Sequence, residues 1–287
     1  MTTRLVPSAT HDRSLRLAAV LDRCAMSWER TGVRHFAELA RRLVRHAEPR
    51  PGDHVLDVAC AAGEALVLAA GAVGPSGTVI GMDVSAHMTR RAARAVVDHG
   101  LANCWVATGD VAAGPPHPIP LADGAFDVAM AGIATCLSPW PERVAARCAE
   151  LLRAGGRFAL PWWGLPDPRW IAALDASVRH HQAESAHWLA MDSPFWTVES
   201  VHEMLRAAGF ASVRTSEEPL LTRFTGPEQW WAWVWSTPAR EFFESLPHHL
   251  VPVIHREVCA ALAALREPDG SLLCRSVARF TVATTPR

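Results

Sequence analysis

The segment from residue 51 to residue 64 constrains the fold of this chain most, and it reads Pro-Gly-Asp-His-Val-Leu-Asp-Val-Ala-Cys-Ala-Ala-Gly-Glu. A Pro-Gly turn leads into a short apolar run, the run ends in small residues, and a helix-compatible segment begins at Glu64. This order predicts a strand, a tight turn and a helix start, in which backbone N–H groups can approach a ligand. Because Asp57 is acidic, the turn suits a ligand with amine or hydroxyl donors better than a pyrophosphate.

Strand and helix signals continue to alternate as far as residue 163. We predict strands over His54–Ala59, Thr78–Asp83, Cys104–Thr108, Phe126–Ala131 and Arg157–Leu160, and helices over Glu64–Ala72, Ala86–Asp98 and Glu142–Arg153. This alternation indicates an α/β fold, a parallel sheet with helices on both faces, in which ligands bind outside the carboxyl ends of the strands. Asp57, Asp83 and Asp110 fall at or near such ends, 26 and 27 residues apart. We therefore expect three carboxylates along one rim of the sheet.

The segments that flank this alternating region add helices and two further strands. Helical spacing predicts N-terminal helices over about 13–48, and prolines bracket a helix-like insertion over 164–196 that we interpret as a lid after the fifth strand. Helices follow near 198–208, from 226 and over 257–265, and strands are expected over 211–224 and 272–283. We interpret the whole chain, 1–287, as one domain with its core at about 50–163 and 197–287.

Composition excludes several classes of function. With 28 basic and 29 acidic residues the net charge is −1, which argues against a nucleic-acid surface. Every basic residue is Arg and Tyr is absent, which excludes a lysine Schiff base and a tyrosine base. The seven cysteines form no C-x-x-C pair, and no His/Asp/Glu set has convincing metal spacing, so no metal is expected. Because no apolar run is long enough for a membrane span or a signal peptide, we expect a cytoplasmic location, without membrane partners; a homo-oligomer stays possible.

Five segments in order match one known family of enzymes. They begin with V-L-D-V-A-C-A-A-G (55–63) and continue with GMDVSAHM (81–88), ATGDV (107–111), PLADGAFDVAMAG (120–132) and ELLRAGGRFAL (150–160). The set resembles the motifs of class I S-adenosylmethionine-dependent methyltransferases, in particular the ubiquinone/menaquinone-biosynthesis type and its small-molecule relatives. The match covers roughly residues 25–163. It implies a Rossmann-like, doubly wound, mainly parallel seven-stranded sheet with an antiparallel last strand, and S-adenosyl-L-methionine as cofactor.

The resemblance also implies which residues bind that cofactor. Asp57 would meet its amino-acid end, Asp83 would accept from both ribose hydroxyls, and Asp110 would accept from the adenine amine. The turn and the neighbouring strand ends supply the other implied contacts: Ala59, Cys60, Ala61, Gly63, Val84, Met88, Gly109, Val111 and Ala131.

The chain departs from the family pattern at two positions of the turn. The glycines expected at 59 and 61 are both alanine, and only Gly63 remains. Ala59 costs little if its φ is negative, whereas a positive φ at Ala61 costs ~1 kcal/mol or more. We therefore expect a slightly different path of the turn or weaker binding of the cofactor.

Tryptophan and histidine supply the candidates for the acceptor side. We predict an aromatic-lined acceptor pocket formed by Trp28, Trp162, Trp163 and Trp196, although a core position for Trp28 is equally open. The four tryptophans at 230, 231, 233 and 235 are expected to anchor a helix on the sheet. The base candidates are His180, His181 and His117; for each of them a surface or core role remains open.

These patterns favour methyl transfer from S-adenosylmethionine to a small, partly apolar acceptor, of the kind found in specialised-metabolite biosynthesis, with the methylated atom unresolved. A dinucleotide oxidoreductase would need G-x-G-x-x-G after the first strand, and residues 59–63 do not supply it. The two alanines keep an alternative open, an S-adenosylmethionine-binding protein of the same fold with a non-methylating role.

Overall fold

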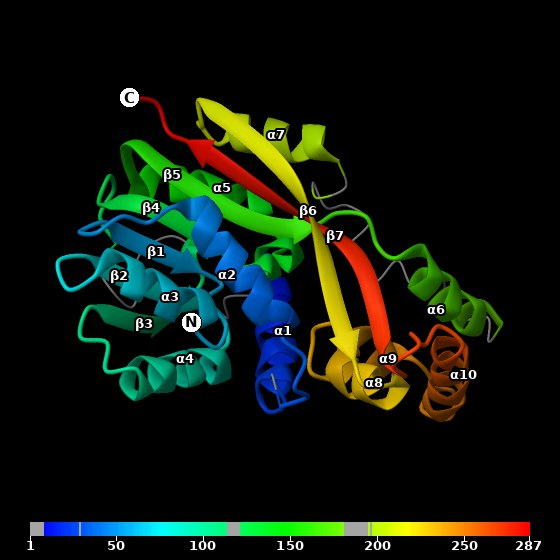
Figure 1. Ribbon diagram of the computed structural model, residues 1–287. Helices are drawn as coiled ribbons and strands as arrows, with labels where there is room; N and C mark the ends of the chain where they lie inside the picture. Colours follow the sequence, from blue (N-terminus) through cyan, green and yellow to red (C-terminus); the bar gives the residue numbers. More distant parts are fainter. Residues whose placement is uncertain (1–8, 29, 114–120, 181–194, 196) are drawn as a thin grey trace, which may run out of the picture.

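One seven-stranded sheet forms the centre of the computed structural model, which describes residues 9–28, 30–113, 121–180, 195 and 197–287 (Figure 1). The strand order is β3-β2-β1-β4-β5-β7-β6. Strand β7 runs antiparallel to β5 and β6, and the pairs among β1 to β5 are parallel. The strands are β1 (His54–Val58), β2 (Thr78–Asp83), β3 (Cys104–Thr108), β4 (Phe126–Ala131), β5 (Leu152–Trp163), β6 (Ser212–Phe224) and β7 (Leu272–Thr284). The predicted doubly wound, mainly parallel sheet with an antiparallel last strand is confirmed.

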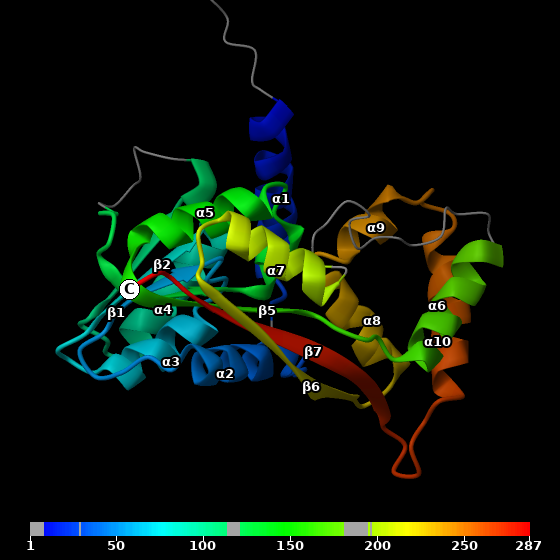
Figure 2. The same cartoon turned by 90° about the horizontal axis from the view of Figure 1, so that it is seen from above.

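Helices cover both faces of the sheet, as predicted (Figure 2). One face carries α2 (His35–Ala47), α3 (Glu64–Val73) and α4 (Ala86–Asp98), and the other carries α5 (Pro141–Leu151) and α7 (Val198–Ala207). Leu43 of α2 and Ala69 of α3 pack with Val128 of β4 on the first face. On the second face, Val144 of α5 and Leu205 of α7 pack with Phe158 of β5. Burial of these apolar stripes stabilises the two layers.

Local sequence signals fix where three of these helices begin. The Ser85 hydroxyl accepts the N–H of Met88 at 3.0 Å and caps α4. The Thr197 hydroxyl likewise accepts the N–H of Ser200 at 3.1 Å and caps α7. Pro141 occupies the first turn of α5, where its missing N–H costs nothing.

Four helices form a helical lobe at the far end of the long β6–β7 ribbon (Figure 1). They are α6 (Pro168–His180), α8 (Pro227–Trp235), α9 (Arg240–Ser245) and α10 (Val251–Ala263). Trp170 of α6 lies 5.4 Å from Phe224 at the end of β6 and 6.0 Å from Trp230 of α8, between ring centroids. Ile254 and Leu262 of α10 belong to the same apolar cluster, so the lobe has its own core.

The helical lobe includes part of the insertion over 164–196 that we interpreted as a lid. The described part of the predicted insertion, α6, packs with α10 and α8, because Trp170 and Leu174 belong to their core. Residues 181–194 and 196 lie outside the described residues, so a lid function of 164–196 stays a prediction. The predicted helix over 257–265 begins earlier, at Val251, and α9 was not predicted. Of the four clustered tryptophans, Trp230 is buried inside the lobe, and Trp233 contacts Phe224 of the sheet at 5.6 Å.

The first helix, α1 (Ala9–Ala25), lies at the rim formed by the carboxyl ends of β1, β2 and β3 (Figure 1). Asp22 Oδ1 accepts a hydrogen bond from the hydroxyl of Ser85 at the start of α4, at 2.5 Å. Arg23 forms an ion pair with Glu244 of α9, at 2.7 Å. Helix α1 therefore bridges the sheet rim and the helical lobe. None of the described helices is long and apolar enough to cross a membrane.

Candidate functional site

The rim under α1 holds a cavity of about 50 Å³ at the carboxyl ends of the parallel strands. Asp83 and Asp110 line it, and α1 contributes Ser14, Leu17 and Leu21 from above. Asp57 lies beneath the turn that follows β1, and the charge of Asp83 contributes to the rise in its pKa. The structure therefore brings the three predicted carboxylates to one rim. The other residues that line the cavity are Val58, Ala59, Met82, Val84, Gly109, Val111, Ala134, Thr135, Ser138, Pro139 and Val144.

The turn over 59–63 has the left-handed backbone that glycine would adopt. Ala59 and Ala61 have φ of 53° and 47°, and Gly63 has a φ of 97°. The condition under which Ala59 would cost little, a negative φ, is therefore not met, and each alanine carries strain on the order of 1–2 kcal/mol. The turn is held from below, because the Cys60 N–H donates to the carbonyl of Met82 at 3.0 Å. Both alanines therefore adopt the left-handed backbone within the turn, and weaker binding of the cofactor stays a prediction.

Close packing around the turn explains why small residues surround it. A Cβ on Gly132, just after β4, would overlap the carbonyl oxygen of Ala59. A Cβ on Gly81 would lie 2.8 Å from Leu66 and 3.1 Å from Sγ of Cys60. Burial raises the pKa of the Cys60 thiol well above its usual value, with the Asp57 charge next in effect, so Cys60 fills space as an inert thiol.

Asp83 at the end of β2 is a buried carboxylate that orders the turn. Its Oδ2 accepts the N–H of Ala61 at 3.0 Å, and its Oδ1 accepts the N–H of Ser85 at 2.8 Å. Burial raises the pKa of this carboxyl to about 6, and the two backbone hydrogen bonds oppose that rise. A carboxylate offers about four acceptor positions, so further donors can still reach it from the cavity.

Asp57 on β1 has the most unusual surroundings of the three acids. It is completely buried, and neither carboxylate oxygen has a hydrogen-bond partner among the described residues. Burial raises its pKa well above the ordinary value, and the charges of Glu64 and Asp83 raise it further. An ionised carboxylate without partners at such a depth is costly, so the site favours a cationic or donor-rich ligand beside it.

Asp110, which follows β3, connects the sheet to α1. Its Oδ1 accepts the N–H of Ala112 at 2.9 Å, and its Oδ2 accepts the hydroxyl of Ser14 at 3.2 Å. A ligand amine that binds Oδ2 must compete with Ser14 or share the oxygen with it. Helix α1 is therefore part of the site, a role that the sequence did not reveal.

An aromatic cluster stands beside the turn on the side of β5 and the helical lobe. The imidazole of His35, at the start of α2, stacks on Trp163 at 5.5 Å and meets Trp233 edge-on at 5.1 Å, between ring centroids. Phe36 stacks on Trp28 at 4.6 Å, and it packs, as Ile133 does, against the buried cluster that contains Leu39 and Phe280. This cluster links the turn to the end of β5.

His35 was not predicted from the sequence. Its Nδ1 lies 2.7 Å from Oγ1 of Thr222, and its buried Nε2 has no hydrogen-bond partner within the described part of the chain. Burial lowers the pKa of the ring to about 4, so the imidazole is neutral at neutral pH. Its position depends on the pairing of α2 with β6, which lies 187 residues away along the chain, and no local pattern indicates it.

The predicted acceptor residues divide into three groups. Trp28 and Trp163 belong to the aromatic cluster, and Trp28 also donates from Nε1 to Glu64 at 2.8 Å. The prediction that Trp162 lines an acceptor pocket needs correction, because this residue is 0% exposed in the core. Its Nε1 donates a hydrogen bond to Oγ1 of Thr281, and the guanidinium group of Arg279 lies over its ring. Successive side chains of a strand point to opposite faces, so Trp162 and Trp163 cannot both face the rim. Trp196 lies outside the described residues.

The predicted base candidates do not gather at the rim in the part of the chain that is described. His117 and His181 lie outside the described residues, and His180 is exposed at the end of α6. Of the other predicted cofactor contacts, Met88 is buried beneath α1 and Ala131 is buried within the sheet, so neither lines the cavity.

Comparisons with known proteins agree with this geometry. Residues 55–156 match the family model of a methyltransferase domain. Nocamycin O-methyltransferase of Saccharothrix syringae is 38% identical over 237 residues, which cover 78% of this chain and 83% of that protein. Aklanonic acid methyltransferase DauC of Streptomyces sp. (strain C5) is 33% identical over 50% of this chain and 63% of that protein.

The same fold is found among solved structures. Phosphoethanolamine N-methyltransferase 2 of Haemonchus contortus, in complex with S-adenosyl-L-methionine, superposes with a TM-score of 0.59 at 15% identity. The superposition covers 94% of this chain and 60% of that one, and at this identity it concerns the fold alone.

Proposed function

This chain belongs to the S-adenosylmethionine-dependent methyltransferases, and we propose that it methylates a hydroxyl oxygen of a small, partly apolar acceptor in specialised-metabolite biosynthesis. The relatives named for nocamycin and aklanonic acid support a small organic acceptor. The one named as an O-methyltransferase spans most of this chain and supports oxygen as the methylated atom.

The observation that carries the proposal is the buried carboxylate of Asp57 beside the left-handed turn, which has no hydrogen-bond partner among the described residues. A cationic ammonium group is the partner that such a carboxylate lacks, so Asp57 would hold the amino-acid end of the cofactor. The remaining acceptor positions of Asp83 would take ribose hydroxyls, and Asp110 would take the adenine amine. The residues present thus fit S-adenosylmethionine.

S-adenosylmethionine supplies a methyl group that its positive sulfur has already activated, so the protein mainly has to position the acceptor and exclude water. The aromatic cluster of Trp28, Phe36, Trp163 and Trp233 would form the apolar wall for that acceptor. Helix α1 would cover the adenosyl end, since Ser14, Leu17 and Leu21 already lie over the cavity.

We assign the acceptor proton to Nε2 of His35. In the tautomer that carries its proton on Nδ1, that N–H would donate to Oγ1 of Thr222, and the neutral ring would present an Nε2 lone pair among aromatic side chains. An acceptor hydroxyl becomes strongly acidic as its oxygen gains the methyl group, so even a weak base takes its proton at that stage. Nε2 of His35 would hold the proton that the acceptor hydroxyl gives up, and the ring would then pass it on to solvent.

The test uses methyl-tritiated S-adenosylmethionine and two organic extracts, one from the parent strain and one from a strain lacking this gene. The account predicts label in an extractable small molecule only with the extract of the deletion strain, which accumulates the unmethylated acceptor. Asp83→Ala protein serves as the negative control. Tight binding of S-adenosylhomocysteine without label transfer to either extract would instead favour the non-methylating role.

A further inference from the structure

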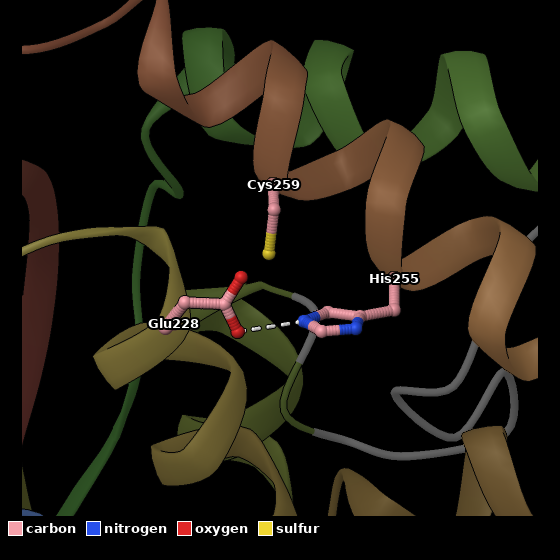
Figure 3. A group of neighbouring side chains, drawn as sticks. All are labelled: Glu228, His255 and Cys259. Carbon is pink, nitrogen blue, oxygen red and sulfur yellow. Dashed lines mark hydrogen bonds and ion pairs between the residues drawn. The ribbon is translucent and has the colours of Figure 1, made fainter.

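Three side chains of the helical lobe point toward one another, far from the rim (Figure 3). Glu228 comes from the first turn of α8, and His255 and Cys259 come from α10. All three ligand atoms, a carboxylate oxygen, an imidazole nitrogen and a thiol sulfur, lie within 4.8 Å of one another. From this juxtaposition we propose that the helical lobe binds a zinc-type divalent cation between α8 and α10.

The spacing on α10 suits a shared ligand. His255 and Cys259 are four residues apart, so their side chains project from the same face of the helix. Nε2 of His255 lies 2.9 Å from Oε2 of Glu228, and the ring stacks on Trp231 with centroids 4.5 Å apart. The stacked indole holds the imidazole in one plane, which preorganises the nitrogen toward the carboxylate and the sulfur.

Only small movements are needed to convert this cluster into a metal site. Zinc sits about 2.3 Å from sulfur and about 2.0–2.1 Å from nitrogen, so tetrahedral ligands end ~3.5 Å apart. The Glu228 side chain is 75% exposed and can withdraw from the 2.9 Å contact without disturbing the core. Cys259 is the buried member, 9% exposed, and it fixes the inner side of the site.

The donor set selects the class of ion. A thiolate together with an imidazole disfavours Ca²⁺ and Mg²⁺, which prefer oxygen ligands, and favours Zn²⁺. On binding, the Cys259 thiol gives up its proton to solvent and the sulfur becomes the ligand, while the neutral His255 ring binds through Nε2. Three protein ligands leave a fourth position, which a water molecule can take on the exposed side of Glu228.

The site would tie together the two longest helices that separate β6 from β7. Helix α8 also carries Trp233, which contacts His35 and Phe224. A cation between α8 and α10 would therefore stiffen the helix that supports the aromatic cluster. Binding of the metal does not depend on methyl transfer, so this proposal and the proposed function can fail separately.

The experiment titrates Co²⁺ into the full chain after removal of metals with a chelator. We expect one equivalent of Co²⁺ to produce a thiolate-to-cobalt charge-transfer band, and added Zn²⁺ to abolish the band because zinc binds such sites more tightly. Cys259→Ser should lose the band, and His255→Ala should weaken Co²⁺ binding by a factor of ~10 or more.

Cys274→Ser is the matched control, because Cys274 is a half-buried thiol on β7 outside the cluster, and it should keep the band. Unchanged binding of S-adenosylhomocysteine would verify that each variant is folded. Absence of a band at excess Co²⁺ would overturn the proposal, leaving a simple Glu228–His255 ion pair. A band of undiminished intensity in Cys259→Ser would overturn it equally.

Discussion

The hydroxyl of Ser14 on α1 donates a hydrogen bond to Oδ2 of Asp110, 96 residues further along the chain, at 3.2 Å. Helix α1 therefore closes over the same carboxylate that the family resemblance assigns to the adenine amine. The cavity beneath α1 is small, about 50 Å³, and we therefore expect α1 to influence how fast the cofactor enters and leaves.

Replacement of Ser14 by Ala should speed the release of bound product. The lost hydrogen bond contributes about 0.5–1.5 kcal/mol to closure, which corresponds to a roughly 2- to 10-fold faster dissociation of S-adenosylhomocysteine. Stopped-flow tryptophan fluorescence measures this rate. Ser27→Ala is the control, because that hydroxyl bonds only locally to the carbonyl of Cys24; equal rates in wild type and Ser14→Ala would show that α1 does not gate the site.

Cofactor affinity should depend on pH through Asp83. Burial raises its pKa to about 6 in the folded chain, so the carboxylate is increasingly protonated below that pH and loses its ability to accept ribose hydroxyls. Affinity for S-adenosylhomocysteine should therefore be about tenfold weaker at pH 5 than at pH 8. The Asp83→Asn variant should bind S-adenosylhomocysteine weakly at both pH 5 and pH 8. Calorimetry at these two pH values measures whether the affinity of the wild type depends on pH and that of the variant does not.

The raised pKa of Asp83 makes the cofactor-free protein less stable as pH rises, whereas cofactor affinity increases with pH. The folded pKa of Asp83 lies above the unfolded value of 3.8, so the folded state binds the proton more tightly. Its contribution to the free energy of unfolding thus falls as pH rises from about 4 to about 6. A wild-type stability that falls less than that of Asp83→Asn over this window would contradict the assignment.

Because Ala61 has a strained backbone, we expect the Ala61→Gly substitution to stabilise the folded chain. Ala61→Gly removes strain of about 1–2 kcal/mol and adds an entropic cost of about 0.5–1 kcal/mol, so the free energy of unfolding should rise by roughly 0.5–1 kcal/mol. Denaturant unfolding measures it. Ala93→Gly in the exposed part of α4 should instead lose about 1 kcal/mol. A loss at both positions would mean that Ala61 is unstrained.

Substitution of His35 tests the assignment of the acceptor proton. His35→Asn should lower kcat by ~100-fold or more, as loss of a general base does, with a much smaller change in KM. His46→Asn is a suitable control, because His46 also stacks on an aromatic ring, Phe280, but away from the rim. An unchanged kcat, or a change confined to KM, would reduce His35 to a packing role.

Much of the sheet could be predicted because its signals are local. Apolar runs placed β2, β3 and β4 at their observed bounds, and the cap residue Ser85 did the same for α4. The three acids of the rim followed from the same repeat. That the whole chain forms one domain stays a prediction.

What could not be predicted depends on contacts between distant segments. Ser14 reaches Asp110, and His35 reaches Thr222, only because the tertiary fold joins α1 and α2 to the rim and to β6. Glu228 is likewise 27 residues from His255, so the pair does not match the short sequence spacings that indicate metal ligands. The prediction that Trp162 faces the rim was wrong because neighbouring side chains along β5 point to opposite faces of the sheet.

Asp57 is buried with no hydrogen-bond partner in the described part of the chain, and we propose that it meets the cationic end of the cofactor. The most direct measurement compares wild type with Asp57→Asn at pH 8, in denaturant unfolding without ligand and in calorimetric titration with S-adenosylhomocysteine. The account predicts a more stable cofactor-free protein, because an amide removes the cost of burying a group that is ionised in the unfolded chain, together with at least ~10-fold weaker binding. Asp98→Asn, on the exposed end of α4, should change neither quantity appreciably. Undiminished binding in Asp57→Asn, or no binding of S-adenosylhomocysteine to wild type, would contradict the account.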